Sequence, residues 1–351
     1  MTQVVERLAD LTGFRDRDLL DVNLAGVLQE LLRPLAVSIY RCVGDPSDRR
    51  WLARARQGAG DAVALADPVW TPLESLPRLA QCPARQQALL AQDVVLQPGQ
   101  PCLSVFPLFS DHQVAGVLEI ETEQALSTAA IRQVGSILRV FRKFRSLLDY
   151  SERDTLTGLL NRKTFDDAFN RLALTAPAQP AAPPAGAAVV VGAGQRSRHC
   201  AAQSHYIGVL DIDHFKRVND AFGHLIGDEV LLLLSRLMRS VFRYHDRLYR
   251  FGGEEFVVLM RCRSDADAGL ALHRLRTALQ TFTFPQVGAI TVSMGYAEVL
   301  PGDTPSLAFD RADRAVYWAK HHGRDQVCSF AALSAQGELR DDTKAGDVEL
   351  F

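Results

Sequence analysis

A chain of 351 residues is long enough for two ordinary domains, each with a core of its own. Its formal net charge of -2 at pH 7 gives no general attraction to nucleic acids or to membrane surfaces. Apolar runs long enough to span a bilayer are absent, the first residues are charged throughout, and the 6 cysteines are scattered without a C-x-x-C pair. We therefore expect a cytoplasmic protein with no leader, no membrane span and no nucleic-acid partner.

Residues 1–126 show the pattern of a mixed domain of helices and strands. Apolar residues at helical spacing between Leu19 and Leu32 predict a helix. Strands are predicted at 35–40, 50–55, 102–108 and 114–120, the last two around a turn at 110–113. The order of helix, strands and helix resembles that of GAF sensory domains. This resemblance implies a sensory domain for a small-molecule ligand that the sequence does not identify.

Residues 127–152 are predicted to form a signalling helix between the two domains. The seam of this helix has alternating three- and four-residue spacing and consists of Ile131, Val134, Leu138, Phe141 and Leu148. Two interpretations stay open, because the seam can form a short two-stranded coil or can pack on its own domain. The expected solvated face carries Arg139, Arg142, Lys143 and Arg145.

Residues 153–332 are predicted to form a second domain, followed by a polar tail at 333–351. An Ala/Pro-rich insertion at about 173–204 cannot supply a core of its own. Strands are expected at 206–211, 247–251, 256–260 and 289–299, and helices at 215–222, 227–243, 265–282 and 305–321. This order predicts an α+β fold, with an antiparallel-rich sheet and helices on one side.

Two groups of carboxylates lie at predicted strand ends in this domain. Glu254 and Glu255 follow a double glycine at the tip of the predicted hairpin, and Asp211 and Asp213 end the preceding strand. Glycine lets a ligand approach the backbone closely, and hard oxygen ligands favour Mg²⁺. The two acidic strand ends therefore predict a shared metal site. Asp211 and Asp213 lie on one face of an ideal strand, so spacing alone does not choose between them.

Five motifs in order give this domain a close resemblance to the GGDEF family of diguanylate cyclases. They are 154–162, 211–224, 227–228, 252–256 and 319–324. The resemblance implies a sheet like the palm of polymerases and nucleotidyl cyclases. It also implies a nucleotidyltransferase that joins two GTP molecules into cyclic di-GMP and releases two pyrophosphates. Because each site of this type holds one GTP, the resemblance further implies a homodimer.

The resemblance also assigns the metal and the catalytic groups. It implies that Asp211, the carbonyl oxygen of Ile212, and Glu254 bind Mg²⁺, with Mn²⁺ as the alternative ion. Glu255 is implied as a further ligand or as the base for the ribose 3′-hydroxyl. Lys216 is implied to offset charge at the reacting phosphate, so that Glu254, Glu255 and Lys216 form the catalytic set.

Substrate contacts follow from the same resemblance. Asn219 and Asp228 are implied to read the guanine edge, with His224 lining the pocket between them and the backbone around Phe215 adding to the phosphate cradle. Lys320 and Arg324 are implied to bind the triphosphate. Without the resemblance, Asn219 and Asp228 pass as a polar helix residue and a helix cap, and Lys320 and Arg324 as a solvated helix end.

Arg243 and Asp246 form an R-x-x-D sequence shortly before the double glycine, at the place of the family's inhibitory product site. This placement implies that cyclic di-GMP limits its own synthesis, and the alternative is an ion pair at a helix end. Two rivals to the cyclase stay open. One is a catalytically silent cyclic di-GMP receptor that signals through Arg243 and Asp246, and the other is a cyclase with a different nucleotide.

Overall fold

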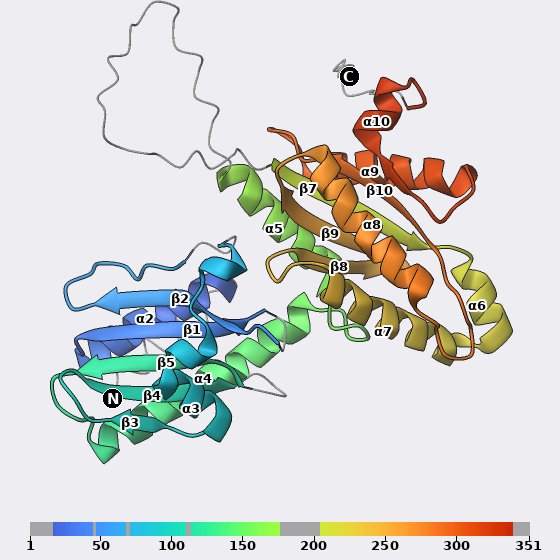
Figure 1. Ribbon diagram of the computed structural model, residues 1–351. Coiled ribbons are helices and arrows are strands. Elements are labelled where there is room, and N and C mark those ends of the chain that lie inside the picture. The colour runs from blue at the N-terminus through green and yellow to red at the C-terminus, as the bar shows by residue number, and fades with distance from the viewer. Residues whose placement is uncertain (1–16, 45–46, 68–70, 110–113, 176–203, 340–351) are drawn as a thin grey trace, which may run out of the picture. The chain divides into compact units, whose positions relative to one another are not determined.

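The computed structural model describes residues 17–44, 47–67, 71–109, 114–175 and 204–339. The chain forms two compact units, residues 1–151 and residues 152–351 (Figure 1). The predicted turn at 110–113, the inner part of the predicted insertion and the end of the predicted tail lie outside the described residues. Among the described residues, no helix is both long enough and apolar enough to cross a membrane.

The first unit is built on an antiparallel sheet with strand order β2-β1-β5-β4-β3. Its strands are β1 (Ala36–Val43), β2 (Arg50–Gly58), β3 (Val95–Gln97), β4 (Cys102–Phe109) and β5 (Val114–Thr122). Its helices are α2 (Arg17–Leu32), the short turns η1 (Leu73–Ser75) and η2 (Leu79–Gln81), α3 (Pro83–Ala91) and α4 (Thr128–Glu152). All four predicted strands and both predicted helices are present, whereas α3 and β3 were not predicted.

Helices cover both faces of this first sheet. Leu24 and Leu28 of α2 and Val134 of α4 pack on one face with Ile39 and Leu118. The other face carries Tyr40, Trp51 and Val117, which pack against α3. The alternation of the two sets along β1 and β5 explains why the sequence shows these strands as nearly continuous apolar runs.

The seam of α4 packs on its own unit, which decides between the two interpretations of its periodicity. Val134 and Phe141 are buried in the core, and Ile131, Leu138 and Leu148 pack partly buried against it. The expectation that Arg145 is solvated is wrong. Its side chain is half-buried, and its charge acts on the buried carboxylate of Asp21, which accounts for the interruption of the seam.

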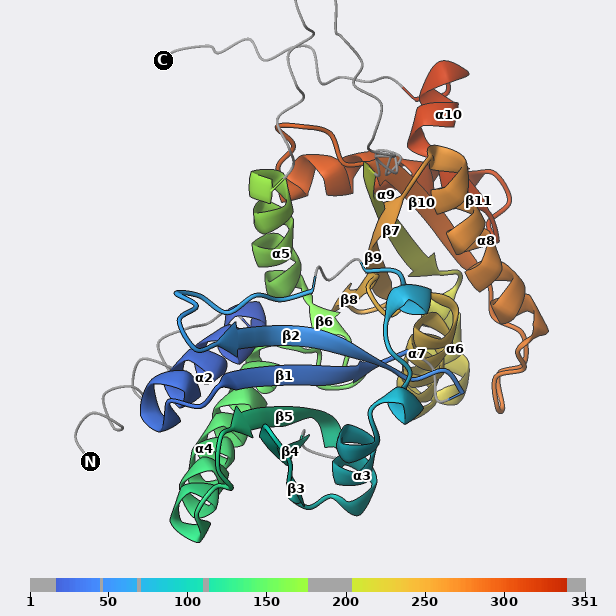
Figure 2. The same cartoon turned by 60° about the vertical axis from the view of Figure 1, so that its left-hand side comes forward.

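The second unit contains a sheet with strand order β11-β10-β7-β9-β8-β6 (Figure 2). Its strands are β6 (Leu160–Asn161), β7 (Ser204–Ile212), β8 (Arg247–Gly252), β9 (Glu255–Cys262), β10 (Val292–Glu298) and β11 (Val327–Ser329). Its helices are α5 (Arg162–Thr175), α6 (Phe215–Phe222), α7 (His224–Val241), α8 (Asp265–Thr281), α9 (Pro305–His321) and α10 (Phe330–Ala335). The β10–β11 and β6–β8 pairs are parallel and the others antiparallel, so the antiparallel-rich sheet is confirmed.

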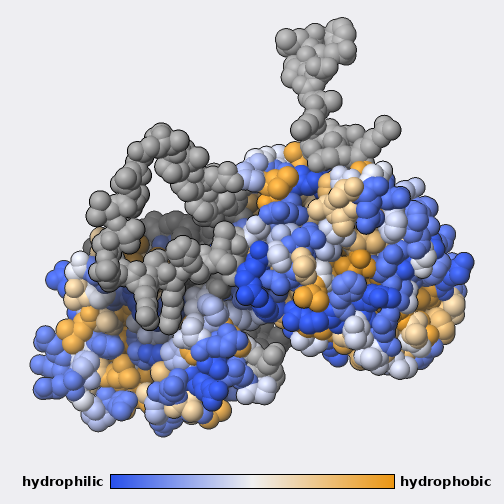
Figure 3. Space-filling view, turned by 45° about the horizontal axis from the view of Figure 1, so that its top comes forward, coloured by the Kyte–Doolittle hydropathy of each residue, from blue (hydrophilic) through white to orange (hydrophobic). Residues whose placement is uncertain are grey.

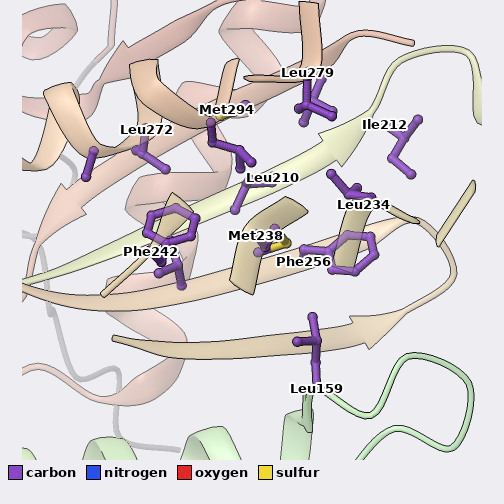
Figure 4. Packing of buried hydrophobic residues seen from close by; sticks show 14 of the residues in the cluster. Leu159, Leu210, Ile212, Leu234, Met238, Phe242, Phe256, Leu272, Leu279 and Met294 are labelled. Carbon is purple, nitrogen blue, oxygen red and sulfur yellow. The ribbon is translucent and has the colours of Figure 1, made fainter. Parts of the chain in front are cut away.

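The prediction that helices cover only one side of this sheet is wrong. On one face Leu210, Phe256 and Met294 pack with Leu234 and Met238 of α7 and Leu272 of α8 (Figure 4). On the other face, side chains of β7 and β9 pack against α5, α9 and α10. The central strands are buried on both faces, which requires helices on both sides.

Several element ends also differ from the predictions; α7, for example, begins at His224 and not at 227, and ends at Val241. Residues 289–291 are not part of the strand, because β10 begins at Val292. Residues 330–335 form α10, whose Leu333 is buried, so the segment expected as a polar tail begins with part of a packed helix. Outside these cores the visible face of the molecule is mostly hydrophilic, with scattered apolar residues (Figure 3).

Candidate functional site

The register of the second sheet sets two of the predicted carboxylates side by side. Asp211 of β7 lies directly opposite Glu255 of β9 in an antiparallel pair. Directly opposed residues of such a pair point to the same face. Like charges at these positions oppose folding, so this arrangement needs a compensating cation. Lys320 of α9 supplies one, because its Nζ atom lies 2.7 Å from Asp211 Oδ1.

Glu254 occupies the turn between β8 and β9, where regular strand alternation does not apply. Gly252 and Gly253 precede it with φ of 143° and 51°, values that L side chains rarely adopt. Burial raises the pKa of Glu254, and the carboxylates of Asp211 and Glu255 raise it further. The turn therefore brings Glu254 close to the carboxylates of Asp211 and Glu255, although Glu254 and Glu255 would point to opposite faces of an ideal strand.

An arginine clamp holds this turn. Arg250 donates from Nε and Nη2 to the carbonyl oxygen of Gly253, over 3.1 and 2.8 Å. Its Nη1 atom donates to both carboxylate oxygens of Asp154, over 3.0 and 3.1 Å. Asp154 in turn accepts from the backbone and the hydroxyl of Thr157. The first of the five motifs thus supports the hairpin that carries the acidic pair.

Hydrogen bonds distinguish the two aspartates that spacing left equivalent. Asp213 is 6% exposed and accepts from Thr291 Oγ1 and Ser293 Oγ, both over 2.7 Å. A third bond comes from the backbone N–H of Asp325, over 3.1 Å. In contrast, Asp211 Oδ1 has its ion pair with Lys320 but no hydrogen bond of good geometry. Asp213 is therefore held by three hydrogen bonds, whereas Asp211 is held by a single ammonium group that a competing cation could replace.

Burial and mutual repulsion raise the pKa of each acidic group at this site. Burial is the larger cause for Asp211, Glu254 and Glu255, and their neighbours add to it, while Lys320 acts in the opposite direction. Asp313 of α9 belongs to the same group, because it raises the pKa of Glu255 and its own pKa is raised. Sequence reasoning missed Asp313, although its position seven residues before Lys320 places both on one side of the helix.

The donor set fits a hard divalent cation. Its members are carboxylates whose pKa burial raises, and the charge of Asp211 raises the pKa of Glu254 and Glu255 further. Carboxylate oxygens match the ligand preference of Mg²⁺ and Mn²⁺. In the part of the chain that the structure describes, however, no three His, Cys, Asp or Glu side chains lie close enough together to hold an ion.

Helices α6 and α7 carry the predicted base-reading residues. Asn219 of α6 is half-buried against Gly227 of α7, where an added Cβ would lie 2.0 Å from Asn219 Oδ1. Gly227 precedes Asp228, which is exposed, as is His224 at the start of α7. The absence of a side chain at position 227 therefore lets the Asn219 amide approach the turn of α7 that carries Asp228.

The predicted phosphate-binding residues lie in different surroundings. Phe215 is buried at the start of α6, where its backbone follows His214 in a left-handed conformation, and Lys216 is exposed. Lys320 is paired with Asp211, so it lies at the acidic group. Arg324 is exposed in the turn that follows α9 and has φ of 59°.

The R-x-x-D segment forms a tight turn between α7 and β8. Asp246 accepts from the backbone N–H of Arg243 over 2.9 Å, and its side chain is 5% exposed. Burial raises the pKa of Asp246 to about 6. Arg243 is exposed. The two residues are close, but only the arginine is presented to solvent.

Comparison with known proteins finds similarity in the second unit. Residues 193–326 match the family model described as diguanylate cyclase, GGDEF domain. The match lies within the second unit. The chain is 34% identical over 219 residues to diguanylate cyclase DgcP of Pseudomonas aeruginosa, covering 60% of this chain and 29% of the relative. It is 32% identical over 183 residues to diguanylate cyclase DgcZ of Escherichia coli, covering 51% and 53%.

The response regulator PleD of Caulobacter vibrioides is 41% identical over 130 residues, covering 35% of this chain and 29% of the relative. The chain thus spans about half or less of the length of these curated relatives. Among solved structures, the GGDEF domain of DgcB from Caulobacter crescentus, in complex with c-di-GMP, is 30% identical with a TM-score of 0.42. That alignment covers 51% of this chain and 96% of the DgcB chain.

Proposed function

We propose that this protein is a diguanylate cyclase that condenses two GTP molecules into cyclic di-GMP and two pyrophosphates. The observation that carries the proposal is the opposition of Asp211 and Glu255 across the β7–β9 ladder, with Glu254 in the adjoining turn. The match of residues 193–326 to the GGDEF family model and the similarity to named diguanylate cyclases support it. A silent receptor has no comparable need for carboxylates that repel one another.

The proposed metal ligands are Asp211, the carbonyl oxygen of Ile212, Glu254 and Glu255. A bound Mg²⁺ or Mn²⁺ would neutralise charge on the phosphates and lower the pKa of a coordinated hydroxyl. Glu255 is the proposed base for the 3′-hydroxyl when it does not bind the metal, because it lies directly opposite Asp211 at the end of β9. Lys320 is expected to exchange Asp211 for a phosphate when GTP binds.

Specificity for guanine is assigned to Asn219 and Asp228. An amide and a carboxylate pair with the N–H donors and the carbonyl acceptor of the guanine edges, which adenine does not present in the same order. The close approach of Asn219 to Gly227 supports a fixed position for the amide. Lys216 and Arg324 supply positive charge for the triphosphate, since both are exposed on segments next to the acidic strand ends.

Activity is proposed to require a homodimer and to be regulated. One site offers one 3′-hydroxyl and one triphosphate, so closure of the ring needs a second site. The first unit is proposed to be the GAF-like sensory domain for an unidentified ligand, and α4 to transmit its state. Cyclic di-GMP is proposed to inhibit by binding at Arg243. Asp246 can bind the same ligand only if its carboxylate gives up the hydrogen bond that it accepts from the Arg243 backbone N–H.

The test is incubation of the purified full-length protein with GTP and Mg²⁺, or Mn²⁺ in a parallel arm, and separation of the products. We expect cyclic di-GMP, activity per chain that rises with protein concentration, and none with chelator. Glu254→Ala is the matched control and should abolish product. A folded, dimeric wild-type protein that makes only linear product, or none, would refute the proposal. Binding of cyclic di-GMP without synthesis would instead support the silent receptor.

A further inference from the structure

The turn after α9 has an unusual backbone. Gly323, Arg324 and Asp325 have φ of 106°, 59° and 42° in succession. Glycine adopts this left-handed region readily, but residues with side chains rarely do. Two such residues in a row persist only when the surrounding structure holds them, and strained backbone of this kind concentrates at functional sites.

Side chains of α8 hold the second of these residues. Arg276 donates from Nε and Nη2 to the two carboxylate oxygens of Asp325, both over 3.0 Å. Gln280, one turn further along α8, donates to the same carboxylate over 2.9 Å. A bidentate arginine fork fixes the orientation of a carboxylate as well as its distance. Asp325 therefore cannot rotate without the loss of several bonds.

The backbone of the turn is held from the other side. The N–H of Asp325 donates to Asp213 Oδ2 over 3.1 Å, and the N–H of Arg324 donates to the carbonyl oxygen of Ala319 over 3.0 Å. Asp213 is buried and lies two residues after Asp211. One carboxylate thus joins the strand end that carries the proposed metal ligand to the turn that carries Arg324.

We propose that Arg276 and Asp325 are positioning residues, which hold the Arg324 guanidinium where it meets the triphosphate of the bound nucleotide. The proposal rests on the proposed function, in which Arg324 binds that triphosphate. In this proposal Arg276 and Asp325 act through Arg324 and not by contact with the substrate. Without their ion pair the turn relaxes toward right-handed backbone and Arg324 moves, and small displacements of a binding group reduce affinity sharply.

An ordinary surface ion pair is the competing explanation, because Arg276 and Asp325 are 32% and 28% exposed. Such pairs contribute little to stability. The two explanations differ in what they predict for nucleotide affinity. A surface pair can be removed without effect on GTP, whereas a positioning pair acts on the KM for GTP through Arg324.

The experiment measures initial rates of cyclic di-GMP synthesis by full-length Arg276→Ala and Asp325→Ala proteins over a range of GTP concentrations. We expect the KM for GTP to rise roughly tenfold, as for other partners that orient a binding residue, with kcat nearly unchanged and little change in melting temperature. Asp325→Asn keeps one acceptor oxygen and should recover part of the affinity. Arg263→Ala, which removes the exposed Arg263–Asp267 pair, is the matched control and should leave KM unchanged.

A double-mutant cycle with Arg324→Ala shows whether the pair acts through that residue. In the Arg324→Ala background, Arg276→Ala should have no further effect on KM, whereas a general structural role would still change it. If Arg276→Ala does not fold, Arg276→Lys replaces it, because lysine keeps the positive charge but cannot form the two-point contact with Asp325. The KM values of Arg276→Lys and Asp325→Asn then show whether this contact affects GTP binding. A wild-type KM in folded Arg276 and Asp325 variants overturns the inference.

Direct binding separates this inference from the proposed function. If wild-type protein makes no cyclic di-GMP, the proposed function fails. Titration calorimetry with a non-hydrolysable GTP analogue then still tests the positioning role. Weaker binding by Arg276→Ala than by wild type supports it, and equal affinity of the two proteins, or no binding by wild type, overturns it.

Discussion

Buried carboxylates have opposite kinds of neighbour in the two compact units. In the first unit, Asp21 accepts two hydrogen bonds from Arg41, and Glu119 accepts two from Arg85, over 2.6 and 2.9 Å. At the β8–β9 hairpin of the second unit, Asp211 faces Glu255, with Lys320 as its ion-pair partner. Paired buried charges belong to the fold, whereas opposed like charges weaken it and point to a ligand.

The directions of the pKa shifts express the same contrast. Burial acts to raise the pKa of Asp21, but the Arg41 guanidinium outweighs it and the pKa is lowered. Burial also acts on Asp211, and there Lys320 does not outweigh it, so the pKa is raised. The comparison teaches that an arginine fork can keep a buried acid ionised as a structural element, whereas a single lysine leaves the pKa of Asp211 raised.

The largest effect is expected for Asp211→Asn. Loss of a proposed metal ligand should lower cyclic di-GMP synthesis by at least about a thousandfold. The melting temperature should stay the same or rise, because a repulsion across the ladder is removed. Product formation and thermal unfolding of the same preparation measure both. Near wild-type synthesis by the variant, or loss of activity because the variant unfolds, would contradict the claim that Asp211 serves catalysis and not the stability of the fold.

Asp21→Asn is the matched change in the first unit. It leaves the buried Arg41 without its counter-ion, so we expect a loss of about 3–5 kcal/mol in the stability of that unit. Hydrogen exchange of β1 and β2 amides reports this unit separately from the other. Asp267→Ala, which removes an exposed pair, should change stability by less than about 0.5 kcal/mol. Equal exchange in the Asp21 variant and wild type would show that the pair is not structural.

His245 and Asp246 are a third case, in which burial favours the neutral form of both side chains. Burial lowers the pKa of His245 to about 4 and raises that of Asp246 to about 6. Between these values the folded pair holds one proton on Asp246, and the unfolded pair holds one on His245, whose ordinary pKa is about 6.5. The proton counts are equal, so the pair makes stability independent of pH in this window.

The His245→Gln variant should show how Asp246 alone makes the free energy of unfolding depend on pH. The folded state then holds a proton that the unfolded state lacks. The stability from Asp246 is therefore fully present below about pH 4 and is lost as pH rises through its folded pKa, by up to about 3 kcal/mol. Denaturant unfolding of the variant and wild type at matched pH values measures the difference. A flat difference from about pH 4 to 6 would contradict the raised pKa of Asp246.

The smallest expected effect comes from Gly227→Ala. The new Cβ would lie 2.0 Å from Asn219 Oδ1 and would displace the amide, so we expect a rise of about tenfold in KM for GTP. Alanine favours helix, so stability should fall little. Gly135→Ala on α4 meets nothing within 4 Å and is the matched control, with unchanged KM. Unchanged KM in the Gly227 variant would show that Asn219 is not held in this way.

Much of the fold follows from local patterns. Helix α9 and helix α6 have the predicted bounds, because their apolar periodicity coincides with local end signals, such as Thr304 before Pro305. Helix α3 and the two-residue strand β6 were missed, since one has few buried residues and the other forms only through its partner β8. The second helical layer of the sheet was missed because continuous apolar strands alone do not show which helices cover them.

The amino-acid sequence by itself determined the elements, the five motifs and the concentration of carboxylates at two strand ends, because these depend on neighbouring residues and on side-chain type. Only the tertiary structure decided that Asp213 is held by three hydrogen bonds while Asp211 pairs with Lys320, that the α4 seam packs on its own unit, and that Asp313 joins the acidic group. It also brought Arg276 to Asp325 across 49 positions. Such pairings depend on register and on the packing of segments far apart in the chain, which no local pattern contains.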